Sequence, residues 1–497
     1  MAEQQPNILL IHADQHRRDC LGAYGNRDVK TPNIDQLAAD GVTYQNHFCA
    51  YPVCTPSRYS LLTGLYTRQH LGWTNHSGIP GCFDTFPTLL KDSGYRTKAV
   101  GKMHFTPTYL DVGFEEMELA EQNGPGRYDD DYHRYLKERG LVDKIDMMDQ
   151  VSACRERAPD WYWDNFGAVE ADLAEEHHST TWIGDRAVET LDAWSEQPQL
   201  LMVGFIKPHH PFDPPAPWSQ MYNPDDLELL PGWTEDPFDK DLEISSGFFN
   251  HTDLTESRLR QAMAYYYATI SHIDHQVGRM IEKLQEKGLY ENTLIIYTSD
   301  HGDYMGHHHM LLKGNHMYDP LVRIPLIMKY PRGTDSGTNS SALCSNIDMA
   351  PTVLSLAGCS VPASMTGIDL TSTPQGRDQV FCESSGGEEL MLRSQSRKLL
   401  FSKRNDEVQF YDLAQDPMEL TDVSENPEYQ NELQEYLQRL MHWGLFDALP
   451  PTYLNEYENI LQQPNVRSLA DNHREEMETY FMNRMEDSLD PHNQQLR

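Results

Sequence analysis

Four short apolar runs of this sequence are each followed by polar side chains that could do chemistry. The runs are 7–11, 97–100, 200–206 and 293–297, and the side chains that follow them are, in the same order, Asp14 with Gln15, Lys102 with His104, Lys207 with His209 and His210, and Asp300 with His301. In open α/β sheets, ligands bind beyond the carboxyl ends of the strands. If the four runs are neighbouring parallel strands, these side chains converge on one crevice; otherwise each belongs to an unrelated surface loop.

Some of these side chains form a plausible ligand set for a hard divalent cation. Asp14 and Asp300 offer carboxylate oxygens, His301 offers an imidazole, and Gln15 could add a neutral carbonyl oxygen. This combination suits Ca²⁺, Mg²⁺ or Mn²⁺ better than a thiolate zinc site. Taken singly, each Asp could equally cap a helix or shape a turn. The adjacent histidines at 307–309 could be further ligands or a solvated loop.

The apolar runs alternate with helical patterns, which predicts an α/β fold with a large, mostly parallel central sheet flanked by helices. A fifth run, 325–328, extends the series. The longest predicted helix lies between the third and fourth runs and ends before Gly288. Its apolar residues recur at spacings of three and four, so that one stripe faces the core: Leu259, Met263, Tyr266, Ile270, Ile273, Val277, Ile281 and Leu284.

The pattern changes after about residue 375. Short strands at 389–393, 398–402 and 408–411, followed by a helix near 429–443, predict a small antiparallel sheet. We therefore expect a catalytic domain over 1–375, a small C-terminal α+β subdomain over 376–445 and an extension over 446–497. The extension carries one weak amphipathic pattern, formed by Leu469, Met477, Tyr480, Phe481 and Met485. That helix needs a surface to pack on, either its own domain or a neighbouring subunit of a homo-oligomer.

The charge of the chain restricts its partners. Asp and Glu number 76 against 40 Lys and Arg, a net charge of -36, which argues against nucleic acid or an anionic membrane as a partner. A site for an anionic substrate must therefore be locally positive. No apolar run is long enough to span a membrane, the N-terminus lacks signal-peptide features, and the eight Cys form no CxxC pair. These features predict a cytoplasmic protein.

The segment Cys54-Thr55-Pro56-Ser57-Arg58, followed by Leu61-Leu62-Thr63-Gly64, resembles the hallmark of the type I sulfatase family, in the alkaline phosphatase superfamily. The resemblance covers roughly residues 6 to 425. Its other matching segments, in the family's order, are Pro6-Asn7-Ile8-Leu9-Leu10 with Asp14-Gln15, Thr31-Pro32-Asn33, Gly101-Lys102-Met103-His104, Lys207-Pro208-His209-His210-Pro211-Phe212, Ser299-Asp300-His301-Gly302, Lys313-Gly314, Arg323-Ile324-Pro325 and Tyr411-Asp412-Leu413.

The resemblance implies an alkaline-phosphatase-like fold and a modified nucleophile. In this family a maturation enzyme oxidises the motif Cys, here Cys54, to formylglycine. One hydroxyl of the aldehyde hydrate attacks sulfur, and the second then ejects sulfate and restores the aldehyde, a route that an ordinary Ser ester lacks. The resemblance also implies one divalent metal, Ca²⁺ first and Mn²⁺ or Mg²⁺ as alternatives. Its ligands would be Asp14, Gln15, the residue derived from Cys54, Asp300 and His301.

The same resemblance assigns roles around the nucleophile. Arg58 would hold the hydrate or a metal ligand, since it lies four residues along a helix from Cys54. Lys102 and Lys313 would supply positive charge, and His104 would assist elimination or orient the hydrate. His209 is the candidate general acid, with His210 as the alternative.

The pair Asp14–Gln15 departs from the Asp-Asp of many family members. It removes one anionic ligand, and it also occurs in relatives that cleave phosphonate monoesters and phosphodiesters. The sequence therefore predicts a sulfatase acting on a carbohydrate or small organic sulfate, with a phosphonate or phosphodiester hydrolase as the alternative. A non-catalytic binding protein is a third reading, against which the complete set of reactive residues argues.

Overall fold

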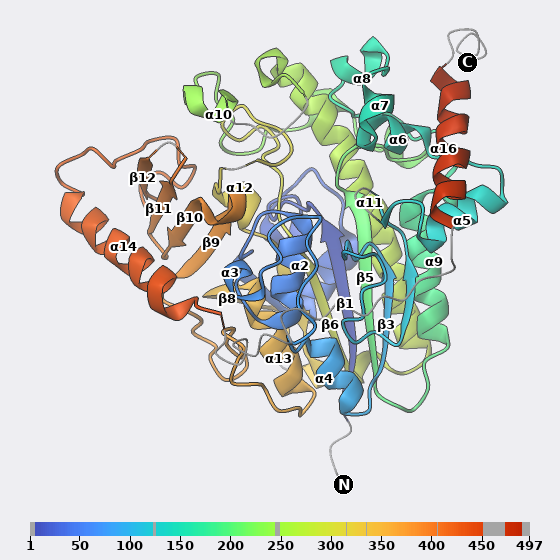
Figure 1. Cartoon of the computed structure of the whole chain (residues 1–497), viewed down its shortest axis with the longest axis horizontal. Helices are drawn as coiled ribbons and strands as arrows, with labels where there is room; N and C mark the ends of the chain where they lie inside the picture. Colours follow the sequence, from blue (N-terminus) through green and yellow to red (C-terminus); the bar gives the residue numbers. More distant parts are fainter. Residues whose placement is uncertain are drawn as a thin grey trace.

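A large mixed sheet forms the centre of the molecule (Figure 1). The computed structural model describes residues 5–122, 126–243, 249–314, 316–333, 335–404, 406–450 and 473–489. The strand order is β4-β3-β5-β1-β6-β7-β2-β8. The strands, in sequence order, are β1 (Asn7–Asp14), β2 (Val42–Phe48), β3 (Arg96–Gly101), β4 (Glu116–Leu119), β5 (Gln199–Pro208), β6 (Thr293–Ser299), β7 (Leu326–Lys329) and β8 (Thr338–Ser345).

Most neighbouring strands of this sheet are parallel, as the sequence predicts. β1 pairs in parallel with β5 on one side and β6 on the other, and β3 pairs in parallel with β5. All residues of β1, β5 and β6 are buried, which explains why these segments are nearly continuous apolar runs. β7 is the exception, because it runs antiparallel to both β6 and β2.

Helices cover both faces of the sheet (Figure 1). On one face, α9 (Ser179–Asp192) and α11 (Glu256–Glu286) pack against alternate residues of β1, such as Leu9 and Ile11. On the other, α2 (Cys54–Thr63), α4 (Phe86–Asp92) and α13 (Met349–Leu356) pack against Ile8 and Leu10. The predicted apolar stripe of α11 is confirmed, since all eight of its residues are buried.

A separate antiparallel sheet of order β12-β11-β10-β9 follows the main one in the chain. Its strands are β9 (Val380–Ser384), β10 (Glu389–Arg393), β11 (Arg397–Ser402) and β12 (Glu407–Asp412), and α14 (Gln430–His442) packs against it. Three of the four strands and the helix match the sequence prediction, whereas β9 was missed. The predicted domain boundaries at 375 and 445 stay predictions.

The C-terminal amphipathic helix, α16 (His473–Leu489), packs on its own chain against α5 (Asp131–Glu138) and α6 (Lys144–Gln150). Met477, Phe481 and Met485 are buried as predicted, and Tyr480 is half-buried. Leu469 lies outside the described residues. The ring of Phe481 stacks on Tyr128 with centroids 5.5 Å apart. The helix thus folds back on its own domain, and the homo-oligomer stays a prediction.

We expect Phe481→Ala to loosen α16 from the domain. Phe481 is fully buried, and truncating such a side chain costs about 3–5 kcal/mol through lost burial and the cavity left behind. Limited proteolysis and thermal unfolding measure the effect, with Glu478→Ala on the exposed face of the same helix as the matched control. Equal protease resistance of the two variants would show that Phe481 does not anchor the helix.

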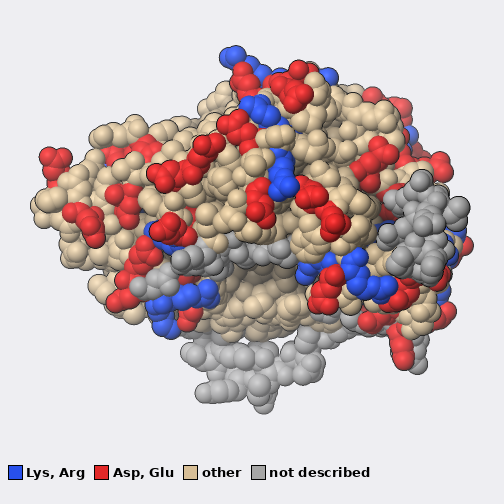
Figure 2. Space-filling model, turned by 90° about the horizontal axis from the view of Figure 1, so that it is seen from above, with Lys and Arg blue, Asp and Glu red and all other residues tan. Residues whose placement is uncertain are grey.

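Acidic side chains dominate the charged surface in the view of Figure 2, with Lys and Arg in smaller scattered groups. This agrees with the net charge of -36. Among the described residues, no helix combines the length and apolar character that crossing a bilayer requires.

Candidate active site

The reactive side chains predicted to follow four strands do converge beyond the carboxyl ends of those strands. Asp14 is the last residue of β1, Lys102 follows β3, and Asp300 follows β6. The Lys102 ammonium lies 2.9 Å from Asp14 Oδ2. His209 follows β5 and lies 3.1 Å from Lys313 Nζ through its Nε2 atom. These side chains therefore form one shared cluster and do not belong to four unrelated loops.

Cys54 begins α2, and all ten residues of this helix are buried. Its Sγ atom lies 3.6 Å from Asp14 Oδ1, 3.4 Å from His301 Nε2 and 3.2 Å from Lys313 Nζ. Burial, reinforced by the Asp14 carboxylate, raises the pKa of the thiol to about 11. The thiol is thus neutral near pH 7, so an unmodified Cys54 is a poor nucleophile here.

Arg58 stands one helical turn after Cys54 and joins the two carboxylates. Its Nη2 atom lies 2.9 Å from Asp14 Oδ2 and 3.0 Å from Asp300 Oδ2, and all three side chains are fully buried. Burial alone would raise the pKa of Asp14, but Lys102 and neighbouring cations hold it well below its usual value. The pKa of Asp300 is also lowered, although burial and Asp14 oppose this, so both carboxylates are ionised, and Arg58 fixes their positions.

The donor atoms of Asp14, Cys54, Asp300 and His301 gather within 4.8 Å of one another, all four residues being buried. Burial and then Lys313 lower the pKa of His301 to about 4, so its ring is neutral. His301 Nδ1 lies 2.9 Å from the Gly302 carbonyl oxygen, which only accepts. The ring proton is therefore on Nδ1, and the lone pair of Nε2 is turned toward the cluster, as metal ligation requires.

Gln15, which directly follows Asp14, has an unsatisfied side-chain oxygen. Its backbone N–H donates to Asp300 Oδ1 at 3.0 Å, and its Nε2 donates to Asp303 Oδ2 at 2.6 Å. Its Oε1 atom is buried and has no hydrogen-bond partner among the described residues. Buried polar atoms of this kind are rare without a ligand or ordered water, so the residues fit a divalent cation.

His104 and His209 are neutral rings beside the two lysines. Burial and then Lys102 hold the pKa of His104 well below its usual value, and neither of its ring nitrogens has a hydrogen-bond partner in the described chain. Burial and then Lys313 hold the pKa of His209 well below its usual value. The Nδ1 atom of His209 donates to the carbonyl oxygen of His210 at 2.7 Å, so its Nε2 accepts from Lys313.

His210 stacks on His209 and is held by Asp149. The two rings stack with centroids 4.4 Å apart. His210 Nδ1 lies 2.5 Å from Asp149 Oδ1, and Tyr162 donates to the other oxygen of that carboxylate. Sequence analysis left the choice between the two histidines open, and this geometry favours His209 as the one that reaches the reacting atoms.

Sequence reasoning missed three supporting residues. Asp303 contacts Gln15, Asp149 contacts His210, and the Asn75 carboxamide oxygen accepts from the backbone N–H of Thr55. Asp303 could have been found from its place two residues after His301. The other two lie on separate segments and carry no local signal. The predicted alternative of a solvated loop at 307–309 is wrong for His307 and His308, which are buried.

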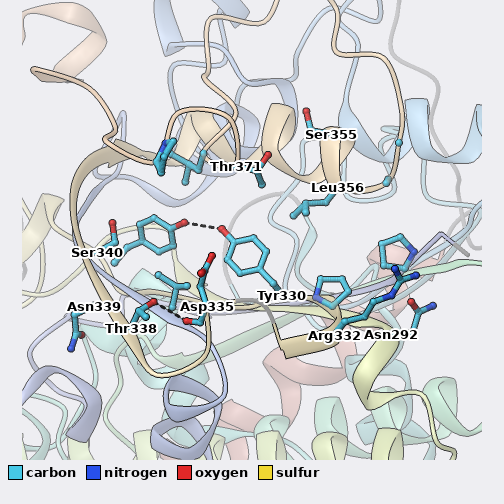
Figure 3. Close-up of a pocket in the computed structure, with 18 residues that line it drawn as sticks. Asn292, Tyr330, Arg332, Asp335, Thr338, Asn339, Ser340, Ser355, Leu356 and Thr371 are labelled. Atoms are coloured by element: carbon cyan, nitrogen blue, oxygen red, sulfur yellow. Dashed lines mark hydrogen bonds between the residues drawn. The ribbon is translucent and has the colours of Figure 1, made fainter. Parts of the chain in front are cut away.

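A cavity of about 780 Å³ lies away from this chemistry, and Figure 3 shows the residues that line it. It is lined by Val42 at the start of β2, Asn292 just before β6 and Thr338 at the start of β8. These are the amino ends of parallel strands, opposite the end that carries Asp14 and Asp300. Two of its lining residues, Tyr44 and Tyr330, are joined by a hydrogen bond, and none of the predicted site residues lines it.

Comparison with protein families decides the family of the chain. The family model for sulfatases matches residues 6–359, which include the whole cluster. The chain belongs to the sulfatase family. A second family model, for the C-terminal part of N-sulphoglucosamine sulphohydrolase, matches residues 306–444.

Known sulfatases resemble the chain along most of its length. An arylsulfatase of Clostridium perfringens is 31% identical over 468 residues, covering 88% of this chain and 94% of that protein. An N-acetylglucosamine-6-O-sulfatase of Bacteroides thetaiotaomicron is 26% identical and covers 88% and 86%. The phosphonate monoester hydrolase of Agrobacterium radiobacter has a similar structure, with a TM-score of 0.74, 25% identity and coverage of 89% and 96%. The chain is a sulfatase enzyme with the predicted alkaline-phosphatase-like fold.

Proposed function

We propose that this sulfatase hydrolyses a sulfate monoester of a carbohydrate or small organic alcohol, using a formylglycine made from Cys54 and one divalent cation. The observation that carries the proposal is the buried cluster of Asp14, Cys54, Asp300 and His301. Arg58 forms ion pairs with both carboxylates of this cluster. The names of the relatives, an arylsulfatase and an N-acetylglucosamine-6-O-sulfatase, support the substrate class.

Asp14, Gln15, Asp300, His301 and the residue derived from Cys54 would hold the cation, with Ca²⁺ preferred over Mn²⁺ and Mg²⁺. When bound, such a cation lowers the pKa of a nucleophilic hydroxyl and neutralises charge on sulfate oxygens. The hydrate made from Cys54 would supply that hydroxyl and the second hydroxyl through which sulfate leaves.

Lys102 and Lys313 make the site attractive to an anion despite the acidic surface. Together with Arg58 they add three cationic side chains to the cluster that contains Asp14 and Asp300. In a buried site, positive groups held in place before the reaction stabilise the charge that develops on the sulfate group. His104, neutral and next to Lys102, would take a proton from the hydrate when sulfate leaves.

His209 and Lys313 would act together as the general acid. His209 Nε2 accepts from the Lys313 ammonium at 3.1 Å, so one proton lies between them and can pass to the leaving oxygen. His210, held by Asp149, keeps the His209 ring in place through stacking.

We therefore expect His209→Ala to lower kcat most for substrates with poor leaving groups. General acid catalysis contributes about 10²- to 10⁴-fold, and 4-nitrophenyl sulfate needs less of this assistance than an alkyl sulfate. His210→Ala is the matched control. Its loss of kcat should be smaller and should not depend on the leaving group. Measuring kcat across leaving groups for both variants tests the assignment. If the loss of kcat depends on the leaving group in His210→Ala but not in His209→Ala, then His210 is the general acid.

Phosphonate monoester or phosphate diester hydrolysis is the second candidate. Gln15 in place of a second Asp favours it, as does the similarity to the phosphonate monoester hydrolase structure. Parallel kcat/KM measurements with an aryl sulfate and an aryl phosphonate monoester separate the two candidates. We expect the sulfate to be preferred.

A further inference from the structure

The two ends of the Gln15 carboxamide have unequal surroundings. Nε2 donates to Asp303 Oδ2 at 2.6 Å, whereas Oε1 is buried without a described hydrogen-bond partner. A carboxylate at position 15 would have two equivalent oxygens. A carboxamide has only one, so a Gln at this position binds a cation only if the correct end is turned toward it.

Asp303 is itself held as an acceptor by its own loop. Its Oδ1 atom accepts from the backbone N–H groups of Met305 at 2.8 Å and Leu312 at 3.1 Å. This leaves Oδ2 as the atom that meets Gln15. A carboxylate oxygen accepts and does not donate, so the amide group of Gln15 must face Asp303 and its oxygen must face away.

We propose that Asp303 is a positioning residue, which selects the carbonyl end of Gln15 for the divalent cation. The proposal rests on the metal site of the proposed function and adds a residue that does not touch the cation. Partners of this kind set the orientation of metal ligands, and their loss costs about 10- to 100-fold in metal affinity.

Asp303→Asn tests the proposal because it keeps the hydrogen bonds of the loop but places a donor, in place of an acceptor, opposite Gln15. The carboxamide oxygen introduced at position 303 can still accept from Met305 and Leu312, so its N–H₂ group must face Gln15. Gln15 must then present its oxygen to that group and its own N–H₂ group to the cation. We expect the dissociation constants of Ca²⁺ and Mn²⁺, measured by calorimetric titration after removal of metal with a chelator, to rise about tenfold or more.

The double variant Q15E/D303N should restore binding. The N–H₂ group introduced at position 303 would donate to one oxygen of the carboxylate introduced at position 15, leaving the second oxygen for the cation. We expect at least the native affinity from this variant. In a Gln15→Leu background, D303N should cause no further loss of affinity, since Asp303 would act only through Gln15.

The thermal unfolding temperature in excess chelator serves as the fold control for each variant. The positioning role would be overturned if D303N bound the cation with native-like affinity, or if the double variant bound it as weakly as D303N does. Neither result would contradict the metal site itself. A D303N variant that unfolds early and is not rescued would make Asp303 a structural residue of its loop, which also overturns it. If the native protein itself binds neither cation, the metal site and this inference both fall.

Discussion

Replacing Cys54 with Ala is expected to abolish sulfate ester hydrolysis and leave the fold intact. The proposed nucleophile derives from this side chain alone, and loss of a covalent nucleophile lowers kcat by about 10⁴-fold or more. The fold should survive because Cys54 is a small residue on a helix that is buried along its whole length. The measurement is kcat on an aryl sulfate, together with circular dichroism and thermal unfolding.

Cys344→Ala is the matched control for this variant. Cys344 is also fully buried and has a free thiol, but it lies on β8, away from the cluster. Its replacement should leave kcat unchanged. A Cys54→Ala enzyme that retains near-normal activity would exclude Cys54 as the source of the nucleophile.

Removal of the divalent cation is expected to have the second largest effect. A Lewis acid contributes several kcal/mol of charge stabilisation, so chelation should lower kcat by about 10³-fold. Adding back Ca²⁺ should restore activity, with Mn²⁺ and Mg²⁺ as comparisons. The fold should persist without metal, because Arg58 and Lys102 already neutralise Asp14 and Asp300.

Asp300→Asn gives an independent check on the metal site. It removes one charged ligand while keeping the size of the side chain, so reactivation should require a higher cation concentration than in the native enzyme. Full activity of a preparation in which elemental analysis finds no divalent metal would contradict the proposed cation.

Much of the fold could be predicted because its core strands are locally encoded. β1, β5 and β6 are buried on both faces and read as apolar runs, and α11 shows its stripe at helical spacing. β2 was missed because its sequence, VTYQNHF, mixes polar with apolar residues although six of its seven positions are buried. The reversed direction of β7 could not be inferred either, since strand direction depends on the connection and not on the residues of the strand.

The site was predictable where its residues fall next to recognisable motifs. Asp14, Cys54, Arg58, Asp300 and His301 all lie in segments that resemble those of the sulfatase family, and the structure brings them together. The supporting contacts were not predictable, because Asp149 is 61 residues from His210 and Asn75 is 20 residues from Thr55. Such pairs arise from tertiary packing and leave no periodic pattern in the sequence.

Mass analysis of the peptide that contains Cys54, taken from an active preparation, tests the central claim most directly. We expect a fraction of this peptide to carry an aldehyde in place of the thiol, to react with an aldehyde-specific hydroxylamine probe, and to rise and fall with the specific activity of different preparations. A fully active preparation in which every copy of residue 54 is an unmodified cysteine would contradict the account.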